Sequence, residues 1–213
     1  MNARLADACS STRSDVSDPL RIEKSMARCV RGRFFAEYAR MMRRRKDIRW
    51  DRVLPADDLD YLRQRIEPDD WYPMETFERF GVAILSELEG VTLDAVRLWG
   101  QFSASQYITE HPDLVALNDP VDSLMRLKVM RSTLFNFPAF DIAMLIEAHA
   151  HVVVTYHMGP TAEEAACHQT MGFCEEVLSV SGATDVRAIF QERSWSGDRR
   201  TLLSLEWRSV PRE

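Results

Sequence analysis

The sequence predicts an α+β fold, in which a five-helix N-terminal half packs on a small antiparallel sheet built as hairpin–helix–hairpin. Apolar residues recur at helical spacing as far as about Phe135, and they alternate at strand spacing after Pro138. One long helical segment then separates two pairs of strand-like segments. The 213 residues are 46% apolar and 28% charged, as in globular proteins. We expect a single domain over 25–213 after a flexible, polar leader over 1–24.

Five amphipathic segments predict the helices of the N-terminal half. Their expected ranges are 32–45, 55–66, 74–89, 93–109 and 119–135. Pro55 suits the first turn of the second helix, Gly90 ends the third, and Asp119-Pro120 provides an N-cap and a first helical residue for the fifth. Residues 68–73, which include two aromatic side chains, predict a rigid turn.

The remainder of the chain predicts four strands and one helix. The first strand presents one apolar stripe, formed by Phe140, Ile142, Met144 and Ile146. The other expected strands are 151–157, 184–193 and 200–208, the last two flanking a turn at 196–198. Between the hairpins, Thr161 and Glu164 form a capping box for a long helix that Gly182 ends.

No motif in the chain specifies a reaction, because nucleophile elbows, phosphate loops, dinucleotide fingerprints and zinc-protease motifs are absent. His149 and His151 would share one strand face, and a zinc enzyme would need His157 to join them. The alternative places these histidines in a solvated turn. All four cysteines, Cys9, Cys29, Cys167 and Cys174, are expected to be free thiols, and Cys167 and Cys174 to be small buried apolar residues. We expect neither a metal nor a catalytic residue.

Charge is unevenly distributed along the chain. Residues 1–65 carry 16 Lys and Arg against 10 Asp and Glu, whereas residues 66–213 carry 11 against 23. The first helix ends in a basic run for which we expect a protein partner or a second copy of the chain, through Arg40, Arg43, Arg44 and Arg45. Nucleic acid is not expected, because the net charge is −6. The sequence lacks a stretch of eighteen apolar residues and an apolar leader segment, so we expect a cytoplasmic protein without a membrane span.

Aromatic and aliphatic residues of the third and fourth helices and the first strand could line an apolar cavity. The candidate ligand-binding residues are Phe80, Ile84, Trp99, Phe102, Phe140 and Met144. The alternative is an ordinary hydrophobic core. If a cavity exists, binding would change how the aromatic helices pack on the sheet.

Several short motifs occur in an order and spacing that resemble a known family. They are Val30-Arg31-Gly32-Arg33, Leu54-Pro55, Asp70-Trp71-Tyr72-Pro73, Leu98-Trp99-Gly100-Gln101-Phe102, Phe135-Asn136-Phe137, Met171-Gly172-Phe173, Ser181-Gly182-Ala183, Ser196-Gly197-Asp198 and Leu205-Glu206-Trp207. Over residues 28–208 the chain resembles a paralogous family of myxobacteria, similar to haem-nitric-oxide-binding and four-vinyl-reductase-like domains. The resemblance implies the fold shared by nitric-oxide sensors and vesicle-tethering subunits, with room for a ligand and a sensory or scaffolding role.

The chain departs from that family at its cofactor positions. Haem-binding relatives have a proximal His on the helix before the first hairpin, but residues 120–138 contain no His. They also have a Tyr-x-Ser-x-Arg motif, whereas Tyr156 is followed by His157, Met158, Gly159 and Pro160. The cysteine pair of the last hairpin in four-vinyl-reductase-like domains is missing from 193–201. We therefore expect no haem or other cofactor.

The sequence thus favours a non-enzymatic cytosolic sensor or regulatory module that binds a small apolar ligand or a partner protein. The first alternative is a structural or interaction protein that acts as a dimer without a ligand. The second is a metal-dependent enzyme that uses His149, His151 and His157.

Overall fold

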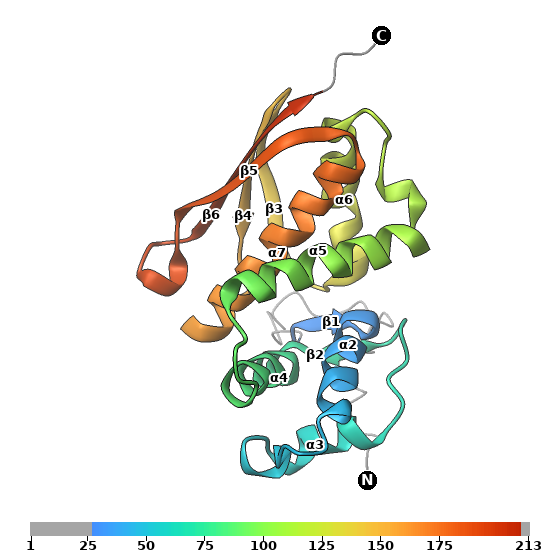
Figure 1. Ribbon diagram of the computed structural model, residues 1–213, viewed down its shortest axis with the longest axis vertical. Helices are drawn as coiled ribbons and strands as arrows, with labels where there is room; N and C mark the ends of the chain where they lie inside the picture. The colour runs from blue at the N-terminus through green and yellow to red at the C-terminus, as the bar shows by residue number, and fades with distance from the viewer. Residues whose placement is uncertain (1–26, 210–213) are drawn as a thin grey trace, which may run out of the picture. The chain divides into compact units, whose positions relative to one another are not determined.

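The computed structural model describes residues 27–209, and these fold as two compact units (Figure 1). The first unit comprises residues 27–87 and 133–137, and the second comprises residues 88–132 and 138–209. The mixed helix and sheet content predicted from the sequence is confirmed. The expected leader over 1–24 lies outside the described residues. No helix within 27–209 has both the length and the apolar character needed to cross a membrane.

The first unit is built around an aromatic core. It consists of β1 (Cys29–Arg31), α2 (Gly32–Arg44), α3 (Ala56–Arg63), β2 (Trp71–Pro73) and α4 (Met74–Glu87). The ring of Phe35 is fully buried, stacked on Tyr72 at 4.6 Å between centroids and in contact with Phe80 at 5.2 Å. Burial of such large side chains is the main stabilising contribution that this small unit can offer.

A two-stranded ribbon replaces the rigid turn that the sequence predicts at 68–73. Val30 pairs with Tyr72, so β1 and β2 run antiparallel. Strands of three residues are too short to show alternation, which is why the pattern reads as a turn. A Cβ atom on Gly32 would lie closer than 3.0 Å to the carbonyl oxygen of Glu67. Glycine is therefore needed for the chain to pass so closely at the start of α2.

Asp58 joins α3 to α4 through a buried ion pair. Its carboxylate is 1% exposed and accepts hydrogen bonds from the Thr76 hydroxyl at 2.9 Å and from the Arg79 guanidinium at 2.5 and 2.8 Å. From its position in the sequence, this acid would be assigned only to the first turn of α3, where the helix dipole stabilises a negative charge. The structure adds a second role, since the buried charge is fully paired.

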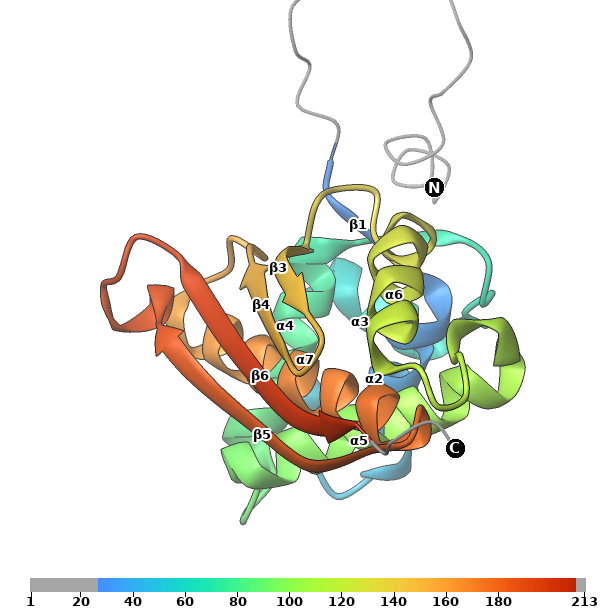
Figure 2. The same cartoon turned by 90° about the horizontal axis from the view of Figure 1, so that it is seen from above.

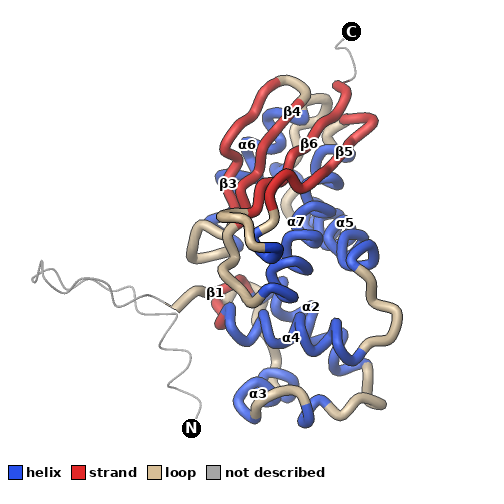
Figure 3. Tube along the Cα trace, turned by 90° about the vertical axis from the view of Figure 1, so that its left-hand side faces the viewer, coloured by secondary structure: helices blue, strands red, loops and turns tan. Residues whose placement is uncertain are grey.

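The second unit has three layers, visible from two directions in Figures 1 and 2: a sheet, α7 and α5. Its elements are α5 (Leu93–Glu110), α6 (Pro120–Leu134), β3 (Phe140–Ile146), β4 (His149–Val154), α7 (Pro160–Val180), β5 (Ala183–Glu192) and β6 (Thr201–Ser209). The strand order is β3-β4-β6-β5 and every pair is antiparallel (Figure 3). The hairpins β3–β4 and β5–β6 are joined by α7.

A bulge in β3 corrects the expected single apolar stripe. Phe140 and Ile142 pair with Val154 and Val152, but Met144 pairs with His151. Ala143 is therefore the additional residue, and it reverses the facing of every residue that follows it. Consequently Met144 lies on the opposite face of the sheet from Phe140. Periodicity cannot reveal such an inserted residue.

The start of α7 also differs from its expected form. The helix begins at Pro160 after Gly159, and no side chain caps it, so the expected capping box of Thr161 and Glu164 is wrong. The neighbouring carboxylate of Glu163 instead accepts hydrogen bonds from the backbone of Tyr156 at 3.3 Å and Met158 at 2.8 Å. This carboxylate therefore fixes the segment that connects β4 to α7.

Helices α5 and α7 cross in close contact through two glycines. A Cβ atom on Gly100 or on Gly172 would lie closer than 3.0 Å to a backbone oxygen of the other helix. Beside this crossing, the buried carboxylate of Glu175 pairs with the Arg97 guanidinium at 2.7 Å and accepts a hydrogen bond from Gln101 at 3.1 Å. The two helices are thus held by backbone contact and by a polar cluster.

Candidate functional site

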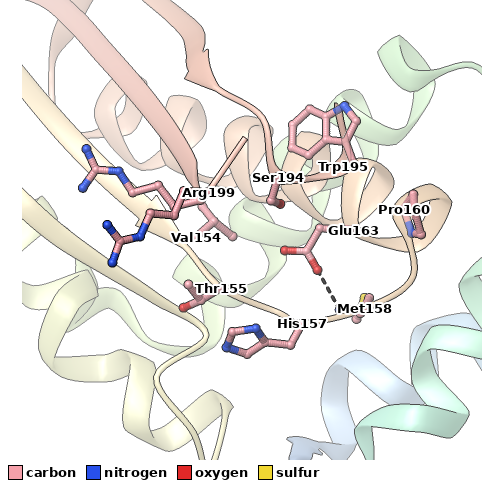
Figure 4. Close-up of a pocket in the computed structure, with 10 residues that line it drawn as sticks. Val154, Thr155, His157, Met158, Pro160, Glu163, Ser194, Trp195 and Arg199 are labelled. Carbon is pink, nitrogen blue, oxygen red and sulfur yellow. Dashed lines mark hydrogen bonds between the residues drawn. The ribbon is translucent and has the colours of Figure 1, made fainter. Parts of the chain in front are cut away.

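A pocket of about 210 Å³ lies within the second unit, where β4 ends, α7 begins and the β5–β6 hairpin turns (Figure 4). Its lining is Val154, Thr155, His157, Met158, Pro160, Glu163, Ser194, Trp195, Arg199 and Arg200. Two segments that are distant in the sequence, 154–163 and 194–200, therefore contribute to one site.

The first wall is the segment from β4 to α7. Thr155 extends the pairing of β4 with the segment that leads into β3, because its amide and its hydroxyl each donate at 2.8 Å to backbone carbonyls of 138–139. His157 adopts a positive φ of 56°, a conformation that is uncommon for residues other than glycine. Glu163 holds the amides on both sides of His157, so this strained turn is fixed from within the pocket.

The second wall is the turn of the β5–β6 hairpin. The hydroxyls of Ser194 and Thr201 lie 2.7 Å apart, and the Asp198 carboxylate accepts the Arg193 amide hydrogen at 2.6 Å. Trp195 packs at a right angle to Phe190, with 5.0 Å between ring centroids. These contacts place the indole of Trp195 at the pocket as a fixed apolar surface.

Charge in the pocket is unequally compensated. The Glu163 carboxylate is buried, and both of its oxygens already accept backbone hydrogen bonds. Arg200 pairs with Glu192 at 2.9 Å, and this guanidinium lowers the pKa of the Glu192 carboxyl. Arg199 is exposed and makes no ion pair with any residue between 27 and 209. The pocket lining therefore includes both Arg199, which has no ion-pair partner among residues 27–209, and the exposed imidazole of His157 (Figure 4).

A half-buried imidazole lies in contact with Trp195. The His168 ring is 5.2 Å from Phe190 and 6.3 Å from Trp195 between centroids. Its Nδ1 is buried and has no hydrogen-bond partner in the described part of the chain. Burial lowers the pKa of His168, so the neutral ring is favoured in this position.

The six residues predicted from the sequence to bind a ligand lie outside this pocket. Phe80 and Ile84 are buried in the first unit, and the other four belong to the second unit. Trp99 and Phe102 are neighbours on α5, 6.2 Å apart, and Phe102 is 55% exposed. Phe140 and Met144 are on opposite faces of β3, as described above. Their role as a lining stays a prediction.

The basic run divides into internal and exposed members. The Arg43 guanidinium donates to the carbonyls of Leu62 at 2.9 Å and Tyr61 at 2.8 Å, and also to that of Gln64. Arg45 pairs with Asp47 at 2.7 Å. Arg40 and Arg44 are exposed and form no ion pair with any described residue. The positions available for a partner are therefore chiefly Arg40 and Arg44.

The histidines are not arranged as a zinc site. His149 and His151 lie on β4 rather than in a turn, with 4.6 Å between ring centroids, and His149 is hydrogen-bonded to the Ser204 hydroxyl at 2.8 Å. His157 follows the far end of that strand. Among residues 27–209 there is no group of three His, Cys, Asp or Glu side chains that could hold a metal ion.

The cysteines do not offer reactive thiolates in the helix. Cys167 and Cys174 are buried free thiols in α7, as expected, and burial raises the pKa of Cys174 to about 12. They therefore pack as small apolar residues. Cys29 is disulfide-bonded, which corrects the expectation that all thiols in the chain are free.

A histidine-ligated haem, which the resemblance implies for the haem-binding relatives, does not fit this chain. Helix α6, which precedes the first hairpin, contains no His. Its buried side consists of small and apolar residues: Ser123, Leu124 and Leu127. Tyr156 is buried, and its hydroxyl is bonded to that of Thr170 at 2.8 Å, while Met158 and Pro160 replace the polar residues of the family motif.

The pocket residues carry no motif from which the sequence could identify them. Trp195 and Arg199 lie in a segment whose pattern predicts only a turn, and Glu163 is explained by its place in the first turn of a helix. The one available signal is the adjacent pair Arg199 and Arg200, which follows Trp195 in the same short segment.

The comparisons with known proteins concern the fold. No protein-family model matches the sequence, and no curated protein matches it significantly. Solved H-NOX structures do match. An Fe(II) H-NOX mutant from S. oneidensis has a TM-score of 0.56 at 13% identity, covering 85% of this chain and 97% of that one. Unliganded Fe(II) H-NOX from K. algicida has a TM-score of 0.56 at 10% identity, with coverages of 86% and 99%. A structure from a study of haem distortion in the H-NOX family has a TM-score of 0.55 at 12% identity, with coverages of 86% and 98%. These matches confirm the resemblance to the haem-nitric-oxide-binding fold.

Proposed function

We propose that the chain is a non-enzymatic sensor or regulatory module that binds a small molecule other than haem and responds by a change in conformation. The H-NOX structures described above are named by Fe(II) states or by haem, and this chain has their fold. Its α6 and its Tyr156 segment do not fit that cofactor. The observation that carries the proposal is the pocket at the start of α7.

A ligand in this pocket would contact three structural elements at once. It would contact the end of β4, the first turn of α7 and the β5–β6 hairpin. The N-cap residue of α7 provides no side-chain cap, so a bound group could add a contact at this helix start. Because α7 is held to α5 through the glycine crossing and Glu175, a shift of α7 would be carried to α5. Ligand binding would thereby favour one packing of the unit over another.

Native mass spectrometry of the full chain as expressed tests this proposal. We expect a non-covalent adduct of small-metabolite mass, without iron or haem, which is released on denaturation. A screen of metabolites by thermal shift should then identify compounds that raise the melting temperature, because a ligand that binds only the native state stabilises it. Protein free of adducts together with a screen that finds no stabilising compound would contradict the proposal.

The apolar-ligand site expected from the sequence stays a separate proposal, which we confine to Trp99 and Phe102 of α5. Phe80 and Ile84 belong to the other compact unit, and Phe140 and Met144 lie on opposite faces of β3. The observation that favours it is on α5, where Phe102 is 55% exposed beside the partly buried Trp99. A neutral apolar probe should bind the full chain, and Phe102→Ala should weaken its binding. Equal weakening by Val129→Ala, at an exposed apolar position on α6, would contradict the assignment.

A second candidate function is self-association or partner binding through the basic end of α2. It is favoured by Arg40 and Arg44, which are exposed and have no ion pair within the described residues. Light scattering should detect a dimer or larger species at low salt that dissociates at high salt. The double variant Arg40→Glu, Arg44→Glu should remain monomeric, and a monomer at every salt concentration for the unmodified chain would refute this candidate.

A further inference from the structure

We propose that the pocket at the start of α7 binds a small organic anion, with a carboxylate or phosphate group at Arg199 and a compact apolar body against Trp195. This inference rests on the proposed function, because it assigns a chemical class to the ligand of the same pocket. It goes beyond that function by predicting which charge the ligand carries and which residues recognise it.

The balance of charge favours an anion over a cation. Glu163 is the one acid in the pocket lining, and it is 5% exposed with both oxygens accepting backbone hydrogen bonds. Arg200 already has Glu192 as its partner. Arg199 has no such partner among residues 27–209, and a guanidinium binds carboxylates and phosphates through two parallel hydrogen bonds.

The start of α7 also favours an anionic ligand. The helix is 21 residues long, and its N-cap residue, Gly159, provides no side-chain hydrogen bond to the helix start. A helix start of this kind carries partial positive charge and favours anions. Pro160, the first helical residue, lies in the pocket lining. The pocket therefore combines a guanidinium, a helix start and the imidazole of His157 around one space.

The size and the apolar lining limit the body of the ligand. The volume of about 210 Å³ is smaller than the pockets of about 300–1,000 Å³ that hold drug-sized ligands. Val154, Met158 and Trp195 provide apolar surface in this space. Trp195 is held by its contacts with Phe190 and with the His168 ring, so a flat apolar group can pack on it without reorganising the hairpin.

Calorimetric titration of the full chain with probes of similar shape and different charge tests the inference. Benzoate and phenyl phosphate carry the two candidate anionic groups, benzamide is the neutral analogue, and benzylamine is the cationic one. Inorganic phosphate tests whether the anion binds without an apolar body. We expect millimolar or tighter binding of one of the two aromatic anions and weaker binding of benzamide, benzylamine and inorganic phosphate. Which aromatic anion binds more tightly distinguishes a carboxylate ligand from a phosphate ligand.

Single substitutions test whether the anion binds in this pocket. Arg199→Gln should weaken binding of the preferred anion by about 10- to 100-fold, as expected for loss of a charge-assisted hydrogen-bonded pair. The matched control is Arg208→Gln, which removes an exposed arginine from the other end of β6, where it pairs with Asp185 at 3.0 Å. It should leave binding unchanged. Trp195→Phe keeps an aromatic ring at the pocket and should remove the ligand-induced change in tryptophan emission.

Several results would overturn the inference. They are binding of benzamide or benzylamine as tightly as the anions, absence of anion binding at millimolar concentrations, and equal effects of Arg199→Gln and Arg208→Gln. If the anions fail while native mass spectrometry still finds a small adduct, the ligand class is wrong and the proposed function stands. If both experiments fail, the proposed function fails as well.

Discussion

Replacement of Gly172 by alanine tests the close crossing of α5 and α7. A Cβ built on Gly172 would lie 1.9 Å from the carbonyl oxygen of Arg97 and 2.9 Å from its carbonyl carbon, whereas ordinary contact begins at 3.4 Å. The obstructing atoms belong to the backbone, so no side-chain rotation relieves the clash, and α5 must retreat by about 1.5 Å. That retreat also separates Arg97 from Glu175.

The expected loss of stability follows from two opposing effects. Overpacking a well-packed interior costs about 1–3 kcal/mol, and the backbone clash places Gly172→Ala at the upper end of that range. Alanine offsets about 1 kcal/mol through its better helix propensity. We expect a net loss of about 2 kcal/mol, which corresponds to a melting temperature lower by about 4–8 °C for a chain of this length.

The assay is chemical and thermal unfolding followed by circular dichroism. Gly81→Ala in α4 is the matched control, because its Cβ would lie 3.4 Å from the Tyr38 ring, at ordinary contact distance. This control should be neutral or more stable by up to about 1 kcal/mol. Gly100→Ala, on the other side of the crossing, should behave like Gly172→Ala. Stabilisation by Gly172→Ala equal to that by Gly81→Ala would refute the close helix contact.

Three further variants test other contacts. Asp58→Asn should lower the free energy of unfolding by about 1–3 kcal/mol, because it leaves Arg79 and Thr76 without their buried charged partner. Asp57→Asn, at an exposed position, should change it by less than about 0.5 kcal/mol. Similar values for the two variants would contradict the buried ion pair. Arg43→Met should destabilise the chain and Arg44→Met should not, because only Arg43 donates hydrogen bonds to the carbonyls at the end of α3. The midpoints of denaturant unfolding measure this difference. Equal midpoints would show that those hydrogen bonds do not contribute to stability. Burial lowers the pKa of His168 in the folded state, so the stability that its neutral ring contributes is present above the ordinary histidine pKa of about 6.5 and is lost as the pH falls through the folded value. The difference in unfolding free energy between the unmodified chain and His168→Gln should therefore decrease on acidification below about pH 6.5, and a constant difference would exclude the buried imidazole as its cause.

The regular elements could be predicted because apolar residues recur at helix or strand spacing and because residues such as proline and glycine mark the helix ends. Helix α6 begins at Pro120 after Asp119, and Gly182, at a φ of 93°, follows α7, as the sequence indicates. The β1–β2 ribbon escaped detection because three residues are too few to show alternation. The facing of Met144 was wrong because the bulge at Ala143 is a tertiary feature of the β3–β4 pairing.

The pocket could not be predicted for a related reason. Glu163 serves the segment before its helix rather than the helix itself, and this choice depends on where β4 ends. Arg199 and Trp195 reach the pocket because the β5–β6 hairpin places its turn beside the start of α7. No spacing within the chain encodes that juxtaposition. The resemblance to the haem-nitric-oxide-binding fold indicated the architecture, and the residues at Tyr156 and in α6 were the basis for expecting no histidine-ligated haem.

Hydrogen exchange of the full chain, with and without the preferred aromatic anion, tests the central claim most directly. If the anion binds at the start of α7 and draws the two segments of the pocket lining together, exchange should slow at residues 155–163 and 193–201. Arg199→Gln should abolish this protection at the same anion concentration. Binding without protection of these two segments, or with protection confined to other parts of the chain, would contradict the claim that this pocket is the sensor site.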